Sequence, residues 1–356
     1  MNPTCYSFFD GVLELTLPHE SLAQWDLLYG RFRTEAPPPE PQFRALWEPH
    51  GPTHGCLRVG PLGRAMEQDA ILLHLQDLVQ NQVLPSVRSC LLWHGAAWAM
   101  EARGLMILGD SGLGKTTLSL AEQHAGGRVL SDEIAVWNPE RCRLRAFPRS
   151  LAVRPDSLNL VGVSTEVARL VLDEEKAMVP LTSRVEEETT LGAVVFLEWP
   201  EDKSEAGSSA VCEACVAAPD STWIEHLRRL AVDVCPHPDG RGWWRCCSAE
   251  PLSAAALEQA MTEGRAVMSA FHRGACRAPS YTGRPALAAL DPLEAARRSM
   301  AGLINGRALV AAYTAPRVLA WARSAFQGLP CVRCVPGALA ETRAALHRLL
   351  QVSGGV

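Results

Sequence analysis

The chain has 356 residues, of which 47% are hydrophobic, so it is long enough for about two or three domains with a sizeable core. Its net charge of -5 and pI near 6.1 exclude bulk attraction to DNA, RNA or an anionic membrane, because such binding requires clustered Lys and Arg. The sequence shows neither an export signal nor an apolar run of the roughly 18 residues that a membrane helix needs. We therefore expect a cytoplasmic protein with no nucleic acid or membrane partner.

The first 85 residues combine strand and helix signals. Leu13, Leu15 and Leu17 alternate with polar residues, which predicts an early strand with one buried face. The Pro-rich stretch 36–41 predicts an exposed connection, and apolar residues at helical spacing predict a helix over 71–79. We expect a small N-terminal α+β domain over residues 1–85.

Two hairpins are predicted in the middle of the chain. The strand-like runs 91–100 and 105–108 are separated by a connection short enough to make them antiparallel neighbours. After a short strand at 128–131, the runs 134–137 and 142–147 flank an Asn-Pro turn and predict the second hairpin. A further buried strand is expected at 194–198.

The overall expectation is an α/β protein with mixed sheets. Its nucleotide-binding core is predicted over residues 86–290, with antiparallel hairpins around a phosphate-binding loop. Residues 291–356 are rich in Ala and Arg and predict a C-terminal subdomain of helix, strand and final helix, the last over 341–350.

The twelve cysteines leave two interpretations open. In a reducing compartment most are expected to be free thiols that pack as small hydrophobic side chains. Cys331 and Cys334 have C-x-x-C spacing, as Cys212 and Cys215 do, but the two pairs lie far apart in sequence, so neither completes a local zinc ribbon. The alternative is a structural zinc site that Cys212 and Cys215 form with Cys235, His237, Cys246 and Cys247.

The strongest chemical signal is the pattern G-x-x-x-x-G-K-[ST], placed after an apolar strand and before a helical run. In this pattern, glycines let the backbone N–H groups face an anion, and the helix start adds its positive dipole end. We expect the loop to bind a nucleotide phosphate, with these cofactor-binding residues: Gly109, Asp110, Ser111, Gly112, Leu113, Gly114, Lys115, Thr116 and Thr117.

Two adjacent acidic residues follow the loop, 17 and 18 positions after Lys115 (132 − 115 and 133 − 115). Lys115 is expected to reach the β- and γ-phosphates, and Thr116 to offer a hydroxyl ligand to Mg²⁺. Asp132 and Glu133 end the strand at 128–131, where one carboxylate can act as base and the other as metal ligand. His94 stands on the predicted hairpin partner and is expected to end near the triphosphate.

These residues together resemble the HPr kinase/phosphorylase family, of phosphoenolpyruvate carboxykinase-like fold, and its kinase-like relatives in bacterial peptide modification. In that family a His-Gly pair precedes a G-x-S-G-x-G-K-[ST] loop and an Asp-Asp pair follows it. The counterparts here are His94-Gly95, residues 109–116 and Asp132-Glu133. Arg154 resembles the arginine that follows the acidic pair. The resemblance covers roughly residues 90–200.

The resemblance implies an ATP- and Mg²⁺-dependent kinase that phosphorylates a serine or similar hydroxyl on a protein or peptide, such as a ribosomally made natural-product precursor. Lys115, His94, Arg154 and Asp132 are then the catalytic residues, with Asp132 as the base. Thr116, Asp132 and Glu133 are the candidate metal ligands. Oligomers are common among such relatives, which leaves a homo-oligomer open.

Two other functions stay open from the sequence. Glu133 stands where the family usually has Asp, and no later family signature is found, which favours a catalytically silent nucleotide-binding accessory protein that recognises a peptide or partner enzyme. A small-molecule kinase is the third alternative, with a closed polar pocket beside Asp132 as its distinguishing feature.

Overall fold

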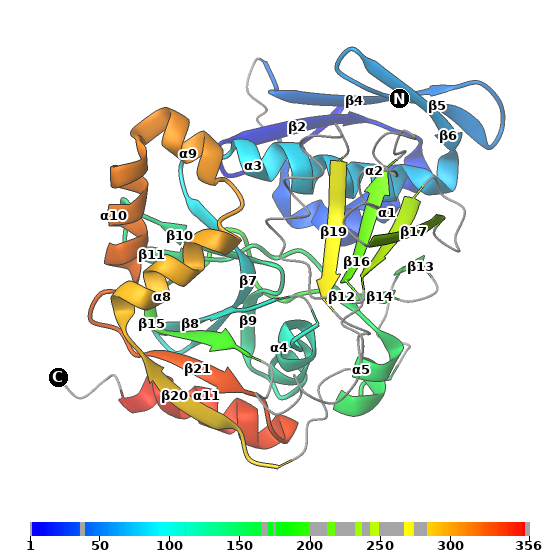
Figure 1. Ribbon diagram of the computed structural model, residues 1–356. Helices are drawn as coiled ribbons and strands as arrows, with labels where there is room; N and C mark the ends of the chain where they lie inside the picture. The colour runs from blue at the N-terminus through cyan, green and yellow to red at the C-terminus, as the bar shows by residue number, and fades with distance from the viewer. Residues whose placement is uncertain are drawn as a thin grey trace. The chain divides into compact units, whose positions relative to one another are not determined.

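The computed structural model describes residues 2–35, 40–110, 112–164, 176–198 and 283–352. Five further strands are described by their backbone alone (Figure 1): β13 (Leu170–Asp173), β16 (Cys212–Ala217), β17 (Val232–Pro236), β18 (Trp243–Ser248) and β19 (Val267–Arg273). The chain divides into two compact units. The first comprises Met1–Gly109, Lys115–Glu198 and Tyr281–Val356, and the second comprises Asp110–Gly114 and Trp199–Ser280. The three predicted domains, 1–85, 86–290 and 291–356, stay a prediction.

The fold is mixed α/β, as expected, with several sheets that combine parallel and antiparallel neighbours. In the N-terminal sheet the order is β3-β1-β2-β4-β5-β6, and β2 and β4 are parallel. The early strand is confirmed, with Leu13 and Leu15 fully buried on one face of β2. The strand bounds are β1 (Thr4–Phe8), β2 (Gly11–Thr16), β3 (Arg33–Thr34), β4 (Phe43–Pro49), β5 (His54–Val59) and β6 (Leu62–Glu67). Most of the predicted Pro-rich connection lies outside the described residues.

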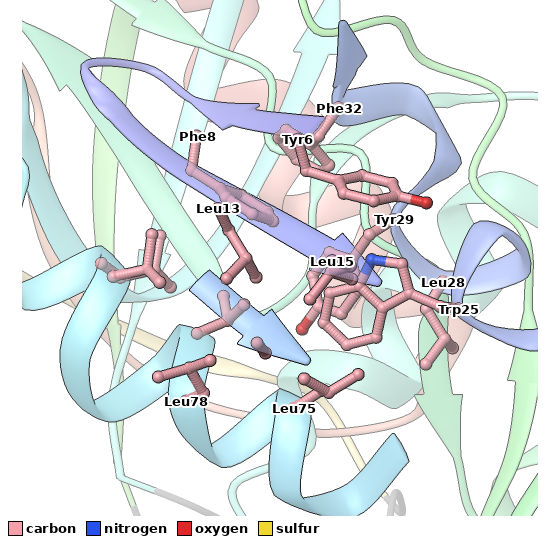
Figure 2. Packing of buried hydrophobic residues seen from close by; sticks show 14 of the residues in the cluster. Tyr6, Phe8, Leu13, Leu15, Trp25, Leu28, Tyr29, Phe32, Leu75 and Leu78 are labelled. Carbon is pink, nitrogen blue, oxygen red and sulfur yellow. The ribbon is translucent and has the colours of Figure 1, made fainter. Parts of the chain in front are cut away.

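Helices α1 (His19–Tyr29) and α2 (Ile71–Leu78) pack against this sheet (Figure 2). The helix expected at 71–79 is confirmed, and it continues through a π-helical turn, η3 (Val79–Val83), into α3 (Leu84–Ser86). Trp25 and Tyr29 of α1 stack with ring centroids 4.4 Å apart and meet Leu75 of α2 in one cluster. Each such buried side chain stabilises the fold by about 1.5–3 kcal/mol.

The larger sheet has the order β11-β10-β7-β8-β15-β21-β20, and β9 pairs with β7. Both predicted hairpins are confirmed, because β7 is antiparallel to β8 and β10 is antiparallel to β11. On its other side β8 has a parallel neighbour, β15, which is itself parallel to β21. The strand bounds are β7 (Leu91–Met100), β8 (Arg103–Leu108), β9 (Arg128–Ser131), β10 (Ile134–Asn138), β11 (Arg143–Arg145), β15 (Glu188–Leu197), β20 (Ala286–Leu290) and β21 (Cys331–Val335).

The remaining described strands form two smaller sheets. In the first unit, β14 (Lys176–Val179) pairs with β12 (Leu151–Val153) on one side and with β13 on the other, and α5 (Pro155–Val161) follows β12. The second unit contains an antiparallel sheet of order β17-β18-β16-β19. In the described part of the chain, no helix is long and apolar enough to cross a membrane.

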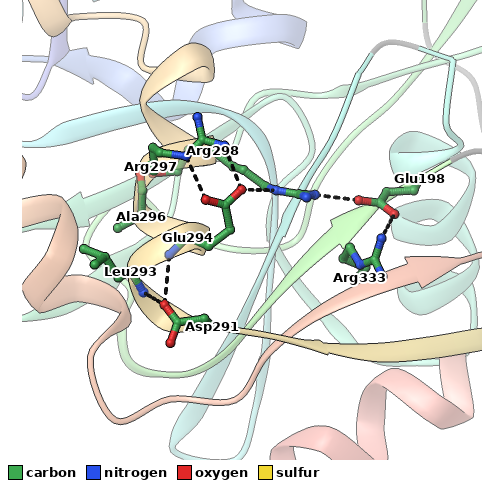
Figure 3. A network of polar contacts seen from close by, with 9 residues as sticks. Glu198, Asp291, Leu293, Glu294, Ala296, Arg297, Arg298 and Arg333 are labelled. Carbon is green, nitrogen blue, oxygen red and sulfur yellow. Dashed lines mark hydrogen bonds and ion pairs between the residues drawn. The ribbon is translucent and has the colours of Figure 1, made fainter.

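The C-terminal region consists of helices around β21, in agreement with the predicted helix, strand and final helix. Its helices are α8 (Pro292–Ser299), α9 (Gly306–Tyr313), α10 (Ala315–Phe326) and α11 (Leu339–Val352). The Asp291 side chain caps α8, and Glu294 binds Arg298, which also contacts Glu198 at the end of β15 at 2.7 Å (Figure 3). Because these ion pairs are exposed, each contributes at most about 1 kcal/mol.

Asn305, directly before α9, is fully buried and joins this region to the start of β7. Its Nδ2 donates to the carbonyl oxygens of Val87 and Cys90 at 2.8 and 2.7 Å. Its Oδ1 accepts from the Leu92 N–H at 3.1 Å. One side chain therefore satisfies three buried backbone groups more than 200 residues away in sequence.

Candidate functional site

The candidate loop lies between β8 and α4 (Lys115–His124), as the pattern predicts. Gly109, Gly112 and Gly114 have φ angles of 146°, 84° and 88°, a region that side-chain-bearing residues rarely adopt. Among the other predicted loop residues, Leu113 is buried and Asp110 is exposed, whereas Ser111 lies outside the described residues. The glycines thus occupy the positions where the backbone requires them.

Lys115, the first residue of α4, is buried at the end of the loop. Its Nζ donates to the Gly109 carbonyl oxygen at 2.6 Å, so the ammonium group lies over the start of the loop. The hydroxyl group of Thr117 lies 2.9 Å from that of Ser157 on α5, which ties the first turn of α4 to its neighbour. The structure therefore holds a positive charge where the phosphate chain is expected.

Asp132 lies beside this helix start because β9 and β10 run along the same edge of β7 and the chain bends between them. The Thr116 hydroxyl donates to Asp132 Oδ2 at 3.0 Å. Asp132 Oδ1 is buried and has no hydrogen-bond partner among the described residues. Burial raises the pKa of Asp132, and the hydroxyl groups of Thr116 and Ser119 and the charges of Lys115 and Arg149 oppose that rise.

His94 stands on β7 opposite Ile134, the first residue after the bend. The next residue, Gly95, donates its N–H to the Glu133 carbonyl oxygen at 2.9 Å. A Cβ at Gly95 would lie 2.6 Å from the Ile107 carbonyl oxygen, so the close approach of β7 and β8 requires glycine after the histidine. Burial, assisted by the charge of Lys115, lowers the pKa of His94 to about 4. The imidazole is therefore neutral at physiological pH.

This pKa predicts a pH-dependent stability. Because the folded-state pKa of His94 lies below its ordinary value of 6.5, the unfolded state takes up this proton first as the pH falls. The contribution of neutral His94 to the free energy of unfolding is therefore full above pH 6.5 and is lost as the pH falls to about 4. We expect the difference in unfolding free energy between wild type and His94→Gln to shrink by up to about 3 kcal/mol over that interval. Urea titrations at several pH values measure it, and a constant difference would contradict the low pKa.

Glu133, the second acidic residue of the bend, faces different partners. Its Oε1 accepts from Gln80 Nε2 at 2.9 Å, and its Oε2 forms an ion pair with Arg149. Sequence reasoning missed both partners, since neither belongs to a motif. The one local signal for Arg149 is an arginine between the apolar residues Phe147 and Leu151.

Arg154 is placed differently from the other predicted catalytic residues. It is exposed and precedes α5, where its carbonyl oxygen accepts from the backbone N–H of Ser157 at 3.0 Å. Among the described residues, no hydrogen bond or ion pair involves its guanidinium group. The structure thus brings together Lys115, Thr116, Asp132 and His94, but not Arg154, whose catalytic role stays a prediction.

The residues beside the loop fit Mg²⁺. This ion prefers hard oxygen ligands, and the Thr116 hydroxyl and the Asp132 carboxylate supply them. The unpartnered Oδ1 of Asp132 is a buried acceptor for a metal-bound group. Thr116 and Asp132 would therefore hold the ion.

The pair Cys331 and Cys334 is buried, which favours packed thiols over a zinc site. Burial raises the pKa of Cys331 to about 11 and that of Cys334 to about 12, which disfavours the thiolate that zinc requires. In the described ranges, no cluster of three or more His, Cys, Asp or Glu side chains could hold a metal ion. The other candidate zinc ligands have side chains outside those ranges: Cys212, Cys215, Cys235, His237, Cys246 and Cys247.

Comparison with models of known protein families finds no match to this chain, and comparison with curated proteins finds none either. The chemistry of the site is therefore inferred from its own residues and their geometry.

Proposed function

We propose that this protein is an ATP-dependent kinase that transfers the γ-phosphate to a serine or similar hydroxyl of a protein or peptide. The observation that carries the proposal is the contact between Thr116, at the start of the loop helix, and the buried carboxylate of Asp132. A loop that cradles phosphates and a base beside it are the two parts that phosphoryl transfer needs. The resemblance of His94, the loop and Asp132 to the HPr kinase/phosphorylase family supports the same function and the corresponding fold.

In this proposal the loop N–H groups and Lys115 hold the β- and γ-phosphates, and Mg²⁺ neutralises their charge when it is bound. Asp132 accepts the proton of the acceptor hydroxyl while the oxygen of that hydroxyl bonds to the γ-phosphorus atom. The bond between that phosphorus and the bridging oxygen of ADP breaks, and ADP takes the electron pair. Neutral His94 can donate or accept a hydrogen bond without adding charge.

Phosphoryl transfer can be tested with purified protein, Mg²⁺ and ATP labelled at the γ-phosphate. The acceptors are serine-containing peptides, including any short peptide encoded beside this gene, and a small phosphocarrier protein. We expect label on one acceptor with the wild type and none with Lys115→Met, because that variant lacks the loop ammonium group.

A silent nucleotide-binding protein would behave differently in the same assay. Nucleotide would raise its melting temperature, because ligand binding stabilises the folded state, but no acceptor would gain label. The engagement of Glu133 with Arg149 and Gln80 is the observation that keeps this second function open. Label on a small metabolite alone would instead identify a small-molecule kinase.

A further inference from the structure

Arg149 is a buried arginine beside the candidate site that the function proposed above does not use. Its side chain is 8% exposed. Its Nη2 donates to Gln76 Oε1 at 2.8 Å, and its guanidinium carbon lies 5.7 Å from the centre of the Tyr29 ring. A buried guanidinium group is costly unless its charge is compensated. Its compensating partner is the carboxylate of Glu133.

Both oxygens of the Glu133 carboxylate have a partner. One oxygen accepts from Gln80 and the other pairs with Arg149, whereas the neighbouring Asp132 keeps one buried oxygen without a described partner. Of the two acidic residues, Asp132 alone therefore has a carboxylate oxygen without a described hydrogen-bond partner. It is also the one that contacts the Thr116 hydroxyl.

The pair connects the bend to the N-terminal region. Tyr29, Gln76 and Gln80 come from α1, α2 and η3, which pack on the N-terminal sheet. Arg149 comes from the segment between β11 and β12. Glu133 is the residue next to Asp132, so movement of its backbone also moves Asp132.

We propose that Arg149 and Glu133 are a positioning pair: they fix the bend that carries Asp132 against helices α1 and α2, and leave Asp132 as the acidic ligand for nucleotide-bound Mg²⁺. This proposal rests on the nucleotide-binding part of the function proposed above, and not on phosphoryl transfer. In this proposal helices α1 and α2 help to fix the geometry of the metal site. It also explains why a glutamate is suitable at position 133, since its longer side chain serves as a counter-ion.

The test measures ADP affinity with and without Mg²⁺, using the full chain and a fluorescent ADP. We define the magnesium increment as the Kd for ADP without Mg²⁺ divided by the Kd with Mg²⁺. Partners that orient a metal ligand typically change metal affinity by about 10–100-fold, so Arg149→Gln should reduce the increment by about tenfold. Its Mg²⁺-free ADP affinity should change by less than about threefold, because the loop and Lys115 are untouched. Arg149→Lys, which keeps the charge, should recover part of the increment.

The role of Glu133 is tested by a double-mutant cycle. If the two residues act as one unit, Glu133→Gln, Arg149→Gln and the double variant should lose similar amounts of the increment. Arg58→Gln is the matched control, because it removes an arginine from an exposed pair with Glu48 and should leave the increment unchanged. Gln76→Leu provides the test if Arg149→Gln does not fold, and should reduce the increment by about threefold through loss of one hydrogen bond.

Three results would overturn the proposal. The first is a full increment in Arg149→Gln together with its loss in Glu133→Gln, which would make Glu133 a metal ligand. The second is a lower melting temperature in the variants with an unchanged increment, which would make the pair merely structural. The third is a wild type without any increment. A wild type that shows the increment but transfers no phosphate would refute the kinase and leave the positioning pair supported.

Discussion

Replacing Asp132 by asparagine is expected to slow phosphoryl transfer by about 10²–10⁴-fold, the usual contribution of a general base. The amide keeps the size of the carboxyl group but cannot accept the proton of the acceptor hydroxyl. ADP should still bind without Mg²⁺, because Lys115 and the loop are unchanged. Single-turnover assays with labelled ATP measure the rate, and fluorescent ADP measures the binding.

Asp156→Asn is the matched control for this substitution. Asp156 is an exposed aspartate in the first turn of α5, so the same chemical change there should leave the transfer rate within about twofold of wild type. Transfer at the wild-type rate in Asp132→Asn would remove Asp132 from the role of base.

Asn305→Ala is expected to lower the free energy of unfolding by about 3–5 kcal/mol. The substitution leaves the carbonyl groups of Val87 and Cys90 and the N–H of Leu92 without their partner, and each unsatisfied buried group costs about 1–3 kcal/mol. Urea denaturation followed by circular dichroism gives the value directly.

The corresponding control is Asn159→Ala. Asn159 is exposed on α5, and its replacement should change the unfolding free energy by less than about 0.5 kcal/mol. A loss under about 1 kcal/mol in Asn305→Ala would mean that water or a local shift satisfies the three backbone groups.

Local patterns were sufficient for much of this structure. The hairpin of β7 and β8, the strand at 128–131 and the loop before α4 are confirmed, because turn residues, alternation and glycine spacing act over a few neighbouring residues. The same local reasoning placed Asp132 at the end of a strand, where it contacts Thr116. The proposed role of Asp132 as base stays a prediction, and so does the catalytic role of Arg154.

Other features could not be derived from local pattern. The parallel pairing of β8 with β15 joins strands about 90 residues apart, and nothing in either strand specifies that neighbour. The hydrogen bond between Gln80 and Glu133 joins residues 53 apart in sequence, and the three contacts of Asn305 join residues 213 to 218 apart. Asn305 has the composition of a surface residue, and only the fold shows that it is buried.

The sequence by itself determined where strands, turns and the candidate loop form, because those choices depend on backbone sterics and short-range hydrophobic spacing. Only the tertiary structure decided which of the two acidic residues keeps an available oxygen and which is held by Arg149. The physical reason is desolvation of Arg149: once the fold buries its guanidinium group, that charge needs an anionic partner, and the available partner depends on which distant segments pack there.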